Sequence, residues 1–296
     1  MRVFLTGANG FIGSNIVQDL QWHGHQVVGL TRSDDGAGAL VKAGAEAFRG
    51  DIEDFEGLAR GASSCDGVIH TAFDHDFSKF VENCQKDARA IEALGSALVG
   101  TDKPLVITSS TAMGSARPGQ TATEDCFNAD SPNPRVASEL AGRALSDRGV
   151  NVSVMRNSQI HDRYKQGLVT NVIELARQKG VSAYLDDGVN AWSAAHVLDT
   201  AALYRLALER HEAGARYHAT AEEAIGFREI AEMIGKTFGL PVQSIGADDA
   251  GAHFGWLAAF VGKDMSASNT LTLERSGWRP AGAGLLADVQ AMAKAA

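Results

Sequence analysis

Residues 5–15 read LTGANGFIGSN, with Gly7, Gly10 and Gly13 standing three residues apart. The short apolar run before them predicts a strand, and the amphipathic run after them predicts a helix. In such a loop the first glycine permits a tight turn, the second lets the backbone approach a pyrophosphate, and the third lets the helix pack on the strand. The N–H groups that begin the helix then face the anion. The predicted dinucleotide contacts are Gly7, Asn9, Gly10, Phe11, Ile12 and Gly13.

The end of the second predicted strand bears on which dinucleotide binds. An acidic residue there would accept a hydrogen bond from the 2′-hydroxyl of NAD, but the chain reads Thr31-Arg32-Ser33. A guanidinium flanked by hydroxyls suits a 2′-phosphate, because arginine binds phosphate through two parallel hydrogen bonds. Asp34 and Asp35 follow at once and weaken the positive field. We therefore expect NADP(H) to be the preferred cofactor, with NAD(H) as the alternative.

The next strand ends supply further candidate contacts to the cofactor. RGDIED, at residues 49–54, follows the third strand, where an aspartate would accept from the adenine amino group and an isoleucine would lie beneath the ring. The fourth strand ends in HTAF, at residues 70–73, and the fifth in a run of hydroxyls at residues 108–111. The carboxyl ends of parallel strands share one edge of a sheet, so these groups converge. The expected contacts here are Asp51, Ile52, His70, Thr71, Ala72 and Thr108.

Composition narrows the class of protein. Of the 296 residues, 45% are hydrophobic and 21% charged, which is ordinary for a globular chain. The net charge of −9 opposes binding to nucleic acid or to an anionic membrane. Three scattered cysteines without a Cys-x-x-Cys pair indicate neither a disulfide framework nor a zinc site, and no His/Cys/Asp/Glu cluster has metal-ligand spacing. We therefore expect no metal. We also expect a cytoplasmic protein, since no signal peptide and no apolar run long enough to span a membrane is evident.

The order of predicted elements indicates the fold class. Apolar strand-like runs alternate with amphipathic helices as far as about residue 162, which predicts a Rossmann-type, doubly wound parallel sheet in an α/β protein. Residues 1–162 would form the dinucleotide-binding domain. Residues 163–296 would form a smaller C-terminal α/β substrate lobe, partly interleaved with the first domain. Residues 117–134, rich in Pro, Asn and Asp, are expected to form a long loop.

Several motifs resemble a known family. TGANGFIG, GDIED, DGVIHTA, VITSSTAMG and VMRNSQIH occur in the order found in extended short-chain dehydrogenases/reductases, the NAD-dependent epimerase/dehydratase group. AWSAAHVLDTAALYRLALE and SGWRP are similar to the C-terminal lobe of this group. The resemblance covers nearly the whole chain. It implies a Rossmann domain, a nicotinamide cofactor and a carbonyl-type substrate between two lobes.

The chain departs from the catalytic signature of this group, Tyr-x-x-x-Lys, in which the lysine lowers the tyrosine pKa and holds the ribose. RVASE stands at the matching place, so Arg135 replaces the tyrosine and Glu139 the lysine. Arginine does not release its proton in proteins, so it cannot be the general acid. Glu139 can still accept hydrogen bonds from the ribose, and we expect that contact. The group's catalytic hydroxyl maps to Ser110, with Ser109 and Thr111 as alternatives.

Another proton donor is therefore expected near the strand ends. His75 follows the fourth strand beside carboxylates, which would raise its pKa and make it an acid. His161 and Tyr164 follow the sixth strand, the former where the group often has Tyr or His. Simple packing and an ordinary loop position are the alternatives for the two histidines. We rank the donors as His75, then His161, then Tyr164, with Ser110 as the partner of the substrate oxygen.

These features favour an NADP(H)-linked oxidoreductase of atypical type that acts on a ketone, an enone or a related small organic molecule. An enone suits a weak acid, because hydride addition gives an enolate that hydrogen bonds can hold. A redox-neutral epimerase or isomerase and a non-catalytic NAD(P)-sensing protein are the alternatives. The expected partner is a small-molecule substrate, and the chain would act as a monomer or homodimer.

Overall fold

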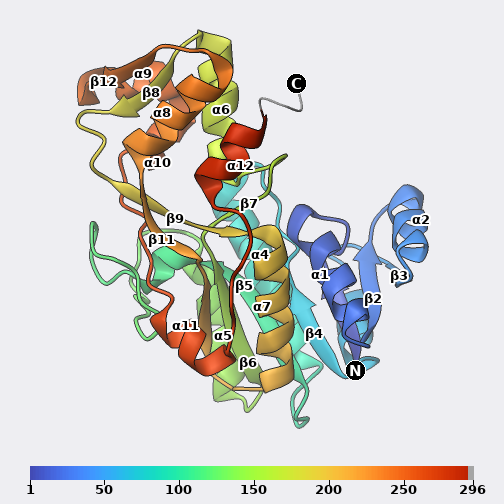
Figure 1. The fold of residues 1–296 in the computed structure, drawn as a ribbon. Helices are drawn as coiled ribbons and strands as arrows, with labels where there is room; N and C mark the ends of the chain where they lie inside the picture. Colours follow the sequence, from blue (N-terminus) through green and yellow to red (C-terminus); the bar gives the residue numbers. More distant parts are fainter. Residues whose placement is uncertain (293–296) are drawn as a thin grey trace.

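A seven-stranded parallel sheet forms the centre of the computed structural model, which describes residues 1–292 (Figure 1). Its strand order is β10-β6-β5-β4-β1-β2-β3, and every neighbouring pair is parallel. The order reverses between β1 and β4, which is where open α/β sheets bind ligands. The predicted Rossmann-type sheet is confirmed. Its strands are β1 (Arg2–Thr6), β2 (Gln26–Thr31), β3 (Glu46–Arg49), β4 (Gly67–His70), β5 (Pro104–Ser110), β6 (Asn151–Asn157) and β10 (Arg216–Ala219).

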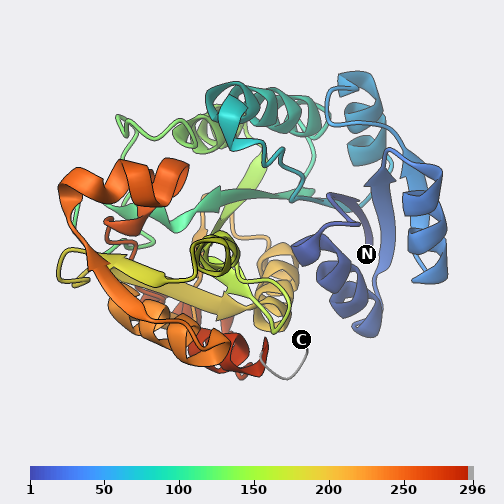
Figure 2. The same ribbon diagram turned by 90° about the horizontal axis from the view of Figure 1, so that it is seen from above.

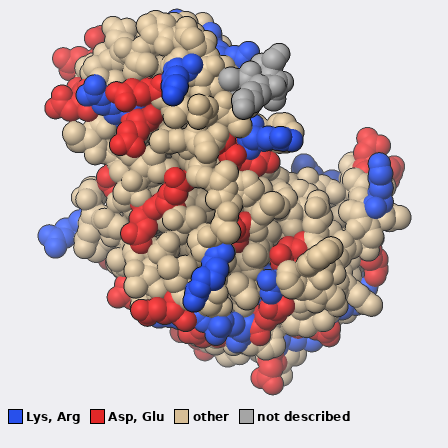
Figure 3. Space-filling view, in the orientation of Figure 1, with Lys and Arg blue, Asp and Glu red and all other residues tan. Residues whose placement is uncertain are grey.

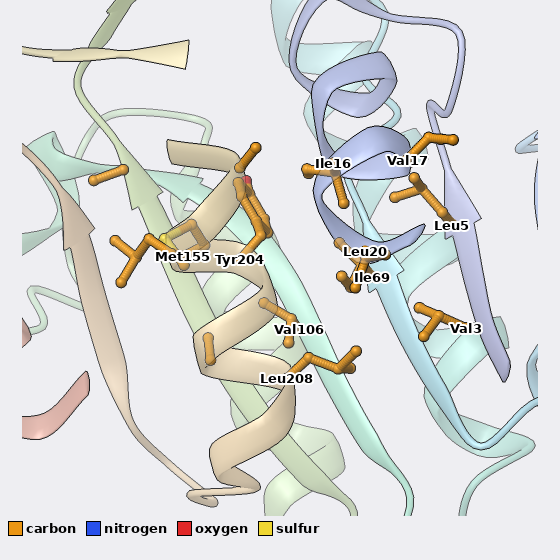
Figure 4. Packing of buried hydrophobic residues seen from close by; sticks show 14 of the residues in the cluster. Val3, Leu5, Ile16, Val17, Leu20, Ile69, Val106, Met155, Tyr204 and Leu208 are labelled. Carbon is orange, nitrogen blue, oxygen red and sulfur yellow. The ribbon is translucent and has the colours of Figure 1, made fainter. Parts of the chain in front are cut away.

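Helices cover both faces of this sheet because its strands are apolar on both sides. On one face α1 and α7 pack against the sheet and each other, through residues such as Ile16, Leu20 and Leu208 (Figure 4). On the other face α3, α4 and α5 bury Leu58, Ile91 and their neighbours. The helices around the sheet are α1 (Phe11–Trp22), α2 (Asp34–Lys42), α3 (Phe55–Ser63), α4 (Phe80–Ser96), α5 (Val136–Asp147), α7 (Val197–Arg210) and α11 (Thr270–Ser276), with short 3₁₀ turns η1 (Phe77–Lys79) and η2 (Thr111–Gly114).

The C-terminal lobe has its own core, which includes Trp192, Phe227 and Leu285. Two small sheets lie in it, one with the order β11-β9-β7 and one that pairs β12 with β8. Its strands are β7 (Gln159–His161), β8 (Ser182–Leu185), β9 (Ala191–His196), β11 (Glu222–Gly226) and β12 (Val242–Ile245). Its helices are α6 (Leu168–Lys179), α8 (Phe227–Phe238), α9 (Ala250–Phe254), α10 (Ala258–Val261) and α12 (Leu285–Ala291), with 3₁₀ turns η3 (Ala247–Asp249) and η4 (Gly255–Leu257).

The chain crosses between the two parts more than once. After β9 it returns to the main sheet as α7, which packs along α1, and as β10, which pairs with β6. The loop over residues 117–134 is tied to the later chain, since Glu124 Oε1 accepts from the backbone N–H and the hydroxyl of Thr272, both at 2.8 Å. Viewed from above, the C-terminal lobe lies over one side of the sheet (Figure 2). Over residues 1–292, no helix has the length and apolar character that crossing a membrane requires.

Candidate functional site

The glycine loop joins β1 to α1 at the carboxyl edge of the sheet. Gly7 has a φ of +71°, which favours glycine, and a Cβ there would lie 2.7 Å from the backbone N of Ala72. A Cβ on Gly13 would lie 2.0 Å from Gly7 O, so this glycine permits the helix to approach the loop. A Cβ on Gly10 would meet only Gly7 O, at 3.1 Å, and otherwise points into open space. These are the three roles that a dinucleotide loop requires.

The start of α1 is suited to an anion. Gly10 is its N-cap, no side chain caps the helix, and its first turn carries no acidic residue. The Phe11 ring at this end lies 5.6 Å from the Lys165 ammonium, which adds a positive charge above the helix start. The surface is hollowed between the C-terminal lobe and the part of the chain around α2 (Figure 3). The loop and helix therefore fit the pyrophosphate of a dinucleotide.

The residues after β2 lie beside this loop. Asn9 Nδ2 donates to Thr31 Oγ1 at 3.0 Å, which joins the glycine loop to the strand end. Ser33 caps α2 by accepting from the Gly36 N–H at 3.0 Å. Arg32 is exposed, and its Nε is 3.8 Å from Asp51 Oδ2. Arg32 is thus held only weakly and is free to meet a ligand.

Two of the other expected cofactor contacts have internal partners. Asp51 accepts from the Glu53 N–H at 3.0 Å, and the neighbouring Ile52 is partly buried against the core of this face. The His70 ring is only 1% exposed, with Nδ1 2.7 Å from Thr6 Oγ1 and Nε2 3.1 Å from Asp87 Oδ1. His70 therefore lies beneath the site and does not face a ribose, which corrects the expectation for this side chain.

Thr71 and Ala72 surround the turn of the glycine loop. Thr71 Oγ1 donates to Thr6 O at 2.8 Å, and the Ala72 N–H donates to Thr6 Oγ1 at 3.3 Å. Both residues therefore hold the end of β4 against the end of β1. Their contact with a bound nucleotide stays a prediction.

Arg135 lies beside β5 and the loop that follows β4. Its Nη2 donates to Thr108 O at 2.9 Å, and its guanidinium carbon lies 4.1 Å from the centre of the Phe73 ring. Nη1 lies 2.8 Å from Asp87 Oδ2, although within residues 1–292 no aligned hydrogen bond reaches it. The contact with Asp87 is thus mainly ionic. A permanently charged guanidinium is held at the edge where the strands end.

Glu139, one turn further along α5, points elsewhere. Its two carboxylate oxygens accept from Nε and Nη2 of Arg156 on β6, at 2.8 and 2.9 Å, and Arg216 Nε lies 3.3 Å away. Both Glu139 and Arg156 are buried. The expected ribose contact of Glu139 does not fit this arrangement, because its oxygens are already committed to an internal, two-pronged ion pair.

The hydroxyls at the end of β5 face both sides of the sheet. Thr108 Oγ1 lies 2.7 Å from the Tyr204 hydroxyl of α7 and donates to His70 O. Ser109, the next residue, points to the face that α5 covers, because side chains alternate along a strand. Its buried hydroxyl has no partner among residues 1–292, whereas Ser110 accepts from the Ala112 N–H at 3.3 Å. Ser109 therefore stays an alternative to Ser110 as the hydroxyl that contacts the substrate oxygen.

His75 lies near Arg135, in a cluster of aromatic rings that joins the loop after β4 to the C-terminal lobe. Its ring centre is 5.3 Å from that of Phe73, and Phe77 stacks on Trp256 at 5.1 Å. Desolvation, followed by the charges of Arg135 and Lys165, lowers the pKa of His75. The expectation of a raised pKa is therefore wrong, because desolvation and then the nearby cations outweigh the carboxylate of Asp74.

The other two candidate donors lie apart from Arg135. His161 is 0% exposed, its Nδ1 is 2.7 Å from Asp288 Oδ2 on α12, and burial lowers its pKa. Tyr164 is 63% exposed and stacks against the Arg163 guanidinium at 4.7 Å. The structure therefore brings only His75 close to Arg135. His161 instead fastens β7 to α12.

Sequence reasoning missed Asp87, the hub of the buried contacts. Its Oδ1 accepts from His70, and its Oδ2 accepts from the Ser138 hydroxyl at 2.6 Å and faces Arg135. Burial raises the pKa of Asp87, but Arg135, His70 and Ser138 together hold it below its usual value. The sequence did contain a signal for Asp87, which is a charged residue on the apolar stripe of α4. It lies three residues after Cys84 and four before Ile91, which is the spacing of the buried face of a helix.

The site therefore combines a glycine loop at a strand–helix turn, a run of hydroxyls at the end of β5 and the buried Arg135 guanidinium. Within residues 1–292, no three His, Cys, Asp or Glu side chains gather where they could hold a metal ion. A family model for the NAD dependent epimerase/dehydratase family matches residues 3–220. The chain belongs to this family.

The following relatives match nearly all of the chain. An uncharacterized protein of Schizosaccharomyces pombe is 45% identical over 290 residues, which are 98% of each chain. UDP-glucose 4-epimerase of Streptomyces lividans is 28% identical and covers 96% of this chain and 93% of its own. Among solved structures, dTDP-glucose 4,6-dehydratase from Streptomyces venezuelae, with NAD and TYD bound, has a TM-score of 0.78 at 19% identity and covers 99% of this chain and 96% of its own.

Proposed function

We propose that this chain is an NADP(H)-linked oxidoreductase that reduces a ketone, an enone or a related small organic molecule. The observation that carries the proposal is the Arg135 guanidinium, held at the ends of β4 and β5 beside an intact dinucleotide loop. A bound nicotinamide nucleotide would supply the hydride. Family members described above act on nucleotide sugars, according to their names, which supports carbonyl chemistry of this general kind.

In this proposal the residues of the chain stabilise the product oxygen. As a hydride adds to the carbonyl carbon, or to the β-carbon of an enone, electrons move onto the oxygen. Arg135 faces this charge and lowers its energy, as fixed cations do in a water-poor site. Ser109 or Ser110 donates a hydrogen bond to the same oxygen, and His75 gives it a proton. Arg135 thereby supplies a fixed positive charge from the sequence position that holds the tyrosine in the family's signature.

A panel of ketones and enones, assayed by loss of NADPH absorbance, tests this function directly. Consumption of NADPH with formation of the reduced product supports it. Tight NADPH binding with no turnover across the panel would favour a nucleotide sensor. A nucleotide that co-purifies and shows no net redox change while a sugar nucleotide is converted would favour an epimerase.

Arg32→Ala is expected to narrow the preference for NADPH over NADH by roughly 1–3 kcal/mol, the range of a charge-assisted hydrogen bond. Arg32 is exposed beside the Ser33 cap of α2, where a 2′-phosphate would meet a free guanidinium. Fluorescence titration of both nucleotides measures the difference. Arg49→Ala is the matched control, because Arg49 pairs with Asp34 at 3.2 Å on the same side. Equal affinities of the unaltered protein for NADPH and NADH would contradict the proposal.

The pH profile of kcat is expected to fall as pH rises through a midpoint below 6.5. A histidine acid donates only while protonated, and the surroundings of His75 lower its pKa from 6.5, so the active form is lost at lower pH than for a free histidine. His75→Asn should remove this limb and lower kcat on the order of 10²-fold. Tyr164→Phe should leave the profile unchanged. A profile that is flat in the unaltered protein would rule out His75 as the donor.

A further inference from the structure

A continuous set of buried polar contacts runs from the glycine loop to Arg135. Thr6, the residue before Gly7, contacts His70 Nδ1 at 2.7 Å, and His70 Nε2 contacts Asp87 Oδ1 at 3.1 Å. Because a carboxylate can only accept, Nε2 carries the proton, and in the neutral ring Nδ1 accepts from the Thr6 hydroxyl. His70 and Asp87 are each about 1% exposed, so water does not share these contacts.

We propose that Asp87 is the positioning residue for the reaction: its carboxylate holds the Arg135 guanidinium where that cation meets the substrate oxygen. The inference deepens the proposed function and rests on it for the role of Arg135. Both carboxylate oxygens of Asp87 have partners. His70 contacts Oδ1, whereas Ser138 and Arg135 contact Oδ2. This fixes the carboxylate rotamer and with it the place of the cation.

The remaining contacts of Arg135 are too weak to do this alone. Thr108 O is a neutral acceptor that fixes one nitrogen, and Phe73 covers one face of the guanidinium. Asp87 supplies the only negative charge within the salt-bridge distance of Arg135 among residues 1–292. An asparagine in its place has a single acceptor oxygen, which His70, Ser138 and Arg135 could not share. Arg135 would then be free to leave the strand ends.

Asp87→Asn is therefore expected to lower kcat roughly tenfold, the factor that about 1.4 kcal/mol of transition-state stabilisation gives. KM and NADPH affinity should stay within about threefold, because Asp87 is buried and the glycine loop is intact. Ser138→Ala gives a graded comparison: it removes one hydrogen bond to the same oxygen but keeps the charge on Asp87, so kcat should fall less than in Asp87→Asn. A purely structural role would instead lower the melting temperature of Asp87→Asn and leave kcat of the folded fraction unchanged.

Chemical rescue tests the same inference in variants that lack Arg135. In Arg135→Ala, guanidinium chloride at tens of millimolar should bind beside Asp87 and raise kcat saturably, whereas urea, which has the same shape without charge, should not. Rescue should be retained in Arg135→Ala/Ser138→Ala and lost in Arg135→Ala/Asp87→Asn. If guanidinium and urea act alike, or rescue survives the loss of Asp87, the positioning role is wrong.

Binding of guanidinium separates this inference from the function on which it rests. Saturation-transfer NMR detects the ion on Arg135→Ala whether or not any ketone is reduced. Binding that needs Asp87, in a protein that turns over no substrate of the panel, would retain Asp87 as the anchor of the cation and refute the proposed function. Turnover in the unaltered protein, with no guanidinium binding to Arg135→Ala, would retain the function and refute the anchor.

Discussion

Arg135→Ala is expected to lower kcat on the order of 10²–10³-fold, the cost of removing one group that stabilises an oxyanion. The guanidinium is held by Asp87 and Thr108 O at the strand ends, so its charge needs no rearrangement during the reaction. NADPH affinity should change far less, because the loop that binds the pyrophosphate is separate. Steady-state kinetics together with NADPH fluorescence measure both quantities.

Arg135→Lys provides the control for this prediction. Lysine keeps the charge but lacks the planar fork that contacts Asp87 and Thr108 O together, so kcat should lie between those of the unaltered protein and the alanine variant. Loss of Arg135 also leaves the buried Asp87 without a cationic partner, at a cost of up to about 3–5 kcal/mol in stability. Circular dichroism therefore has to show that the alanine variant is folded. Full turnover in a folded alanine variant would remove Arg135 from the reaction.

Gly10→Val is expected to weaken NADPH binding roughly 100-fold or more, about 2.7 kcal/mol, in a protein that still folds. A side chain at Gly10 meets only Gly7 O within the chain and otherwise fills the space in front of the loop, where the pyrophosphate would lie. NADPH fluorescence titration measures the loss. Gly251→Val, at a position with nothing within 4 Å of a Cβ, is the control for the substitution itself.

Gly13→Val separates binding from folding in the same loop. Its Cβ would lie 2.0 Å from Gly7 O and 2.8 Å from Gly7 C, so the loop or the helix has to move. This variant should lose thermal stability as well as binding, whereas Gly10→Val should lose binding alone. Tight NADPH binding by folded Gly10→Val would show that the loop does not hold the pyrophosphate.

Local sequence predicted the loop and the sheet because their determinants lie within a few residues. Gly7, Gly10 and Gly13 act through backbone geometry inside one strand–turn–helix unit, and their roles follow from spacing alone. The alternation of apolar strands and amphipathic helices likewise specifies a parallel sheet with both faces covered.

The partners of the polar residues depended instead on contacts between distant parts of the chain. Asp87 meets Ser138 across 51 residues, and His161 meets Asp288 across 127, so neither pairing is visible in a local pattern. The spacing of Glu139 from Arg135 suggested a place near the cofactor. Tertiary packing brought Glu139 against the buried Arg156 of β6 instead. The lowered pKa of His75 was missed for the same reason, because desolvation by neighbouring groups and then the charges of Arg135 and Lys165 come from other elements.

The central sheet includes β10, which comes from the C-terminal half of the sequence, and this limits how the protein can be truncated. A fragment that stopped at residue 162 would lack both the strand that covers β6 and the helix α7 that shields Leu20, Ile69 and Val106. The fragment would expose an apolar face and the unpaired edge of β6, and both would favour self-association. The two parts are therefore not interchangeable modules. Recombination with a relative should exchange residues 197–219 together with the N-terminal half, and the whole chain should melt in one cooperative step.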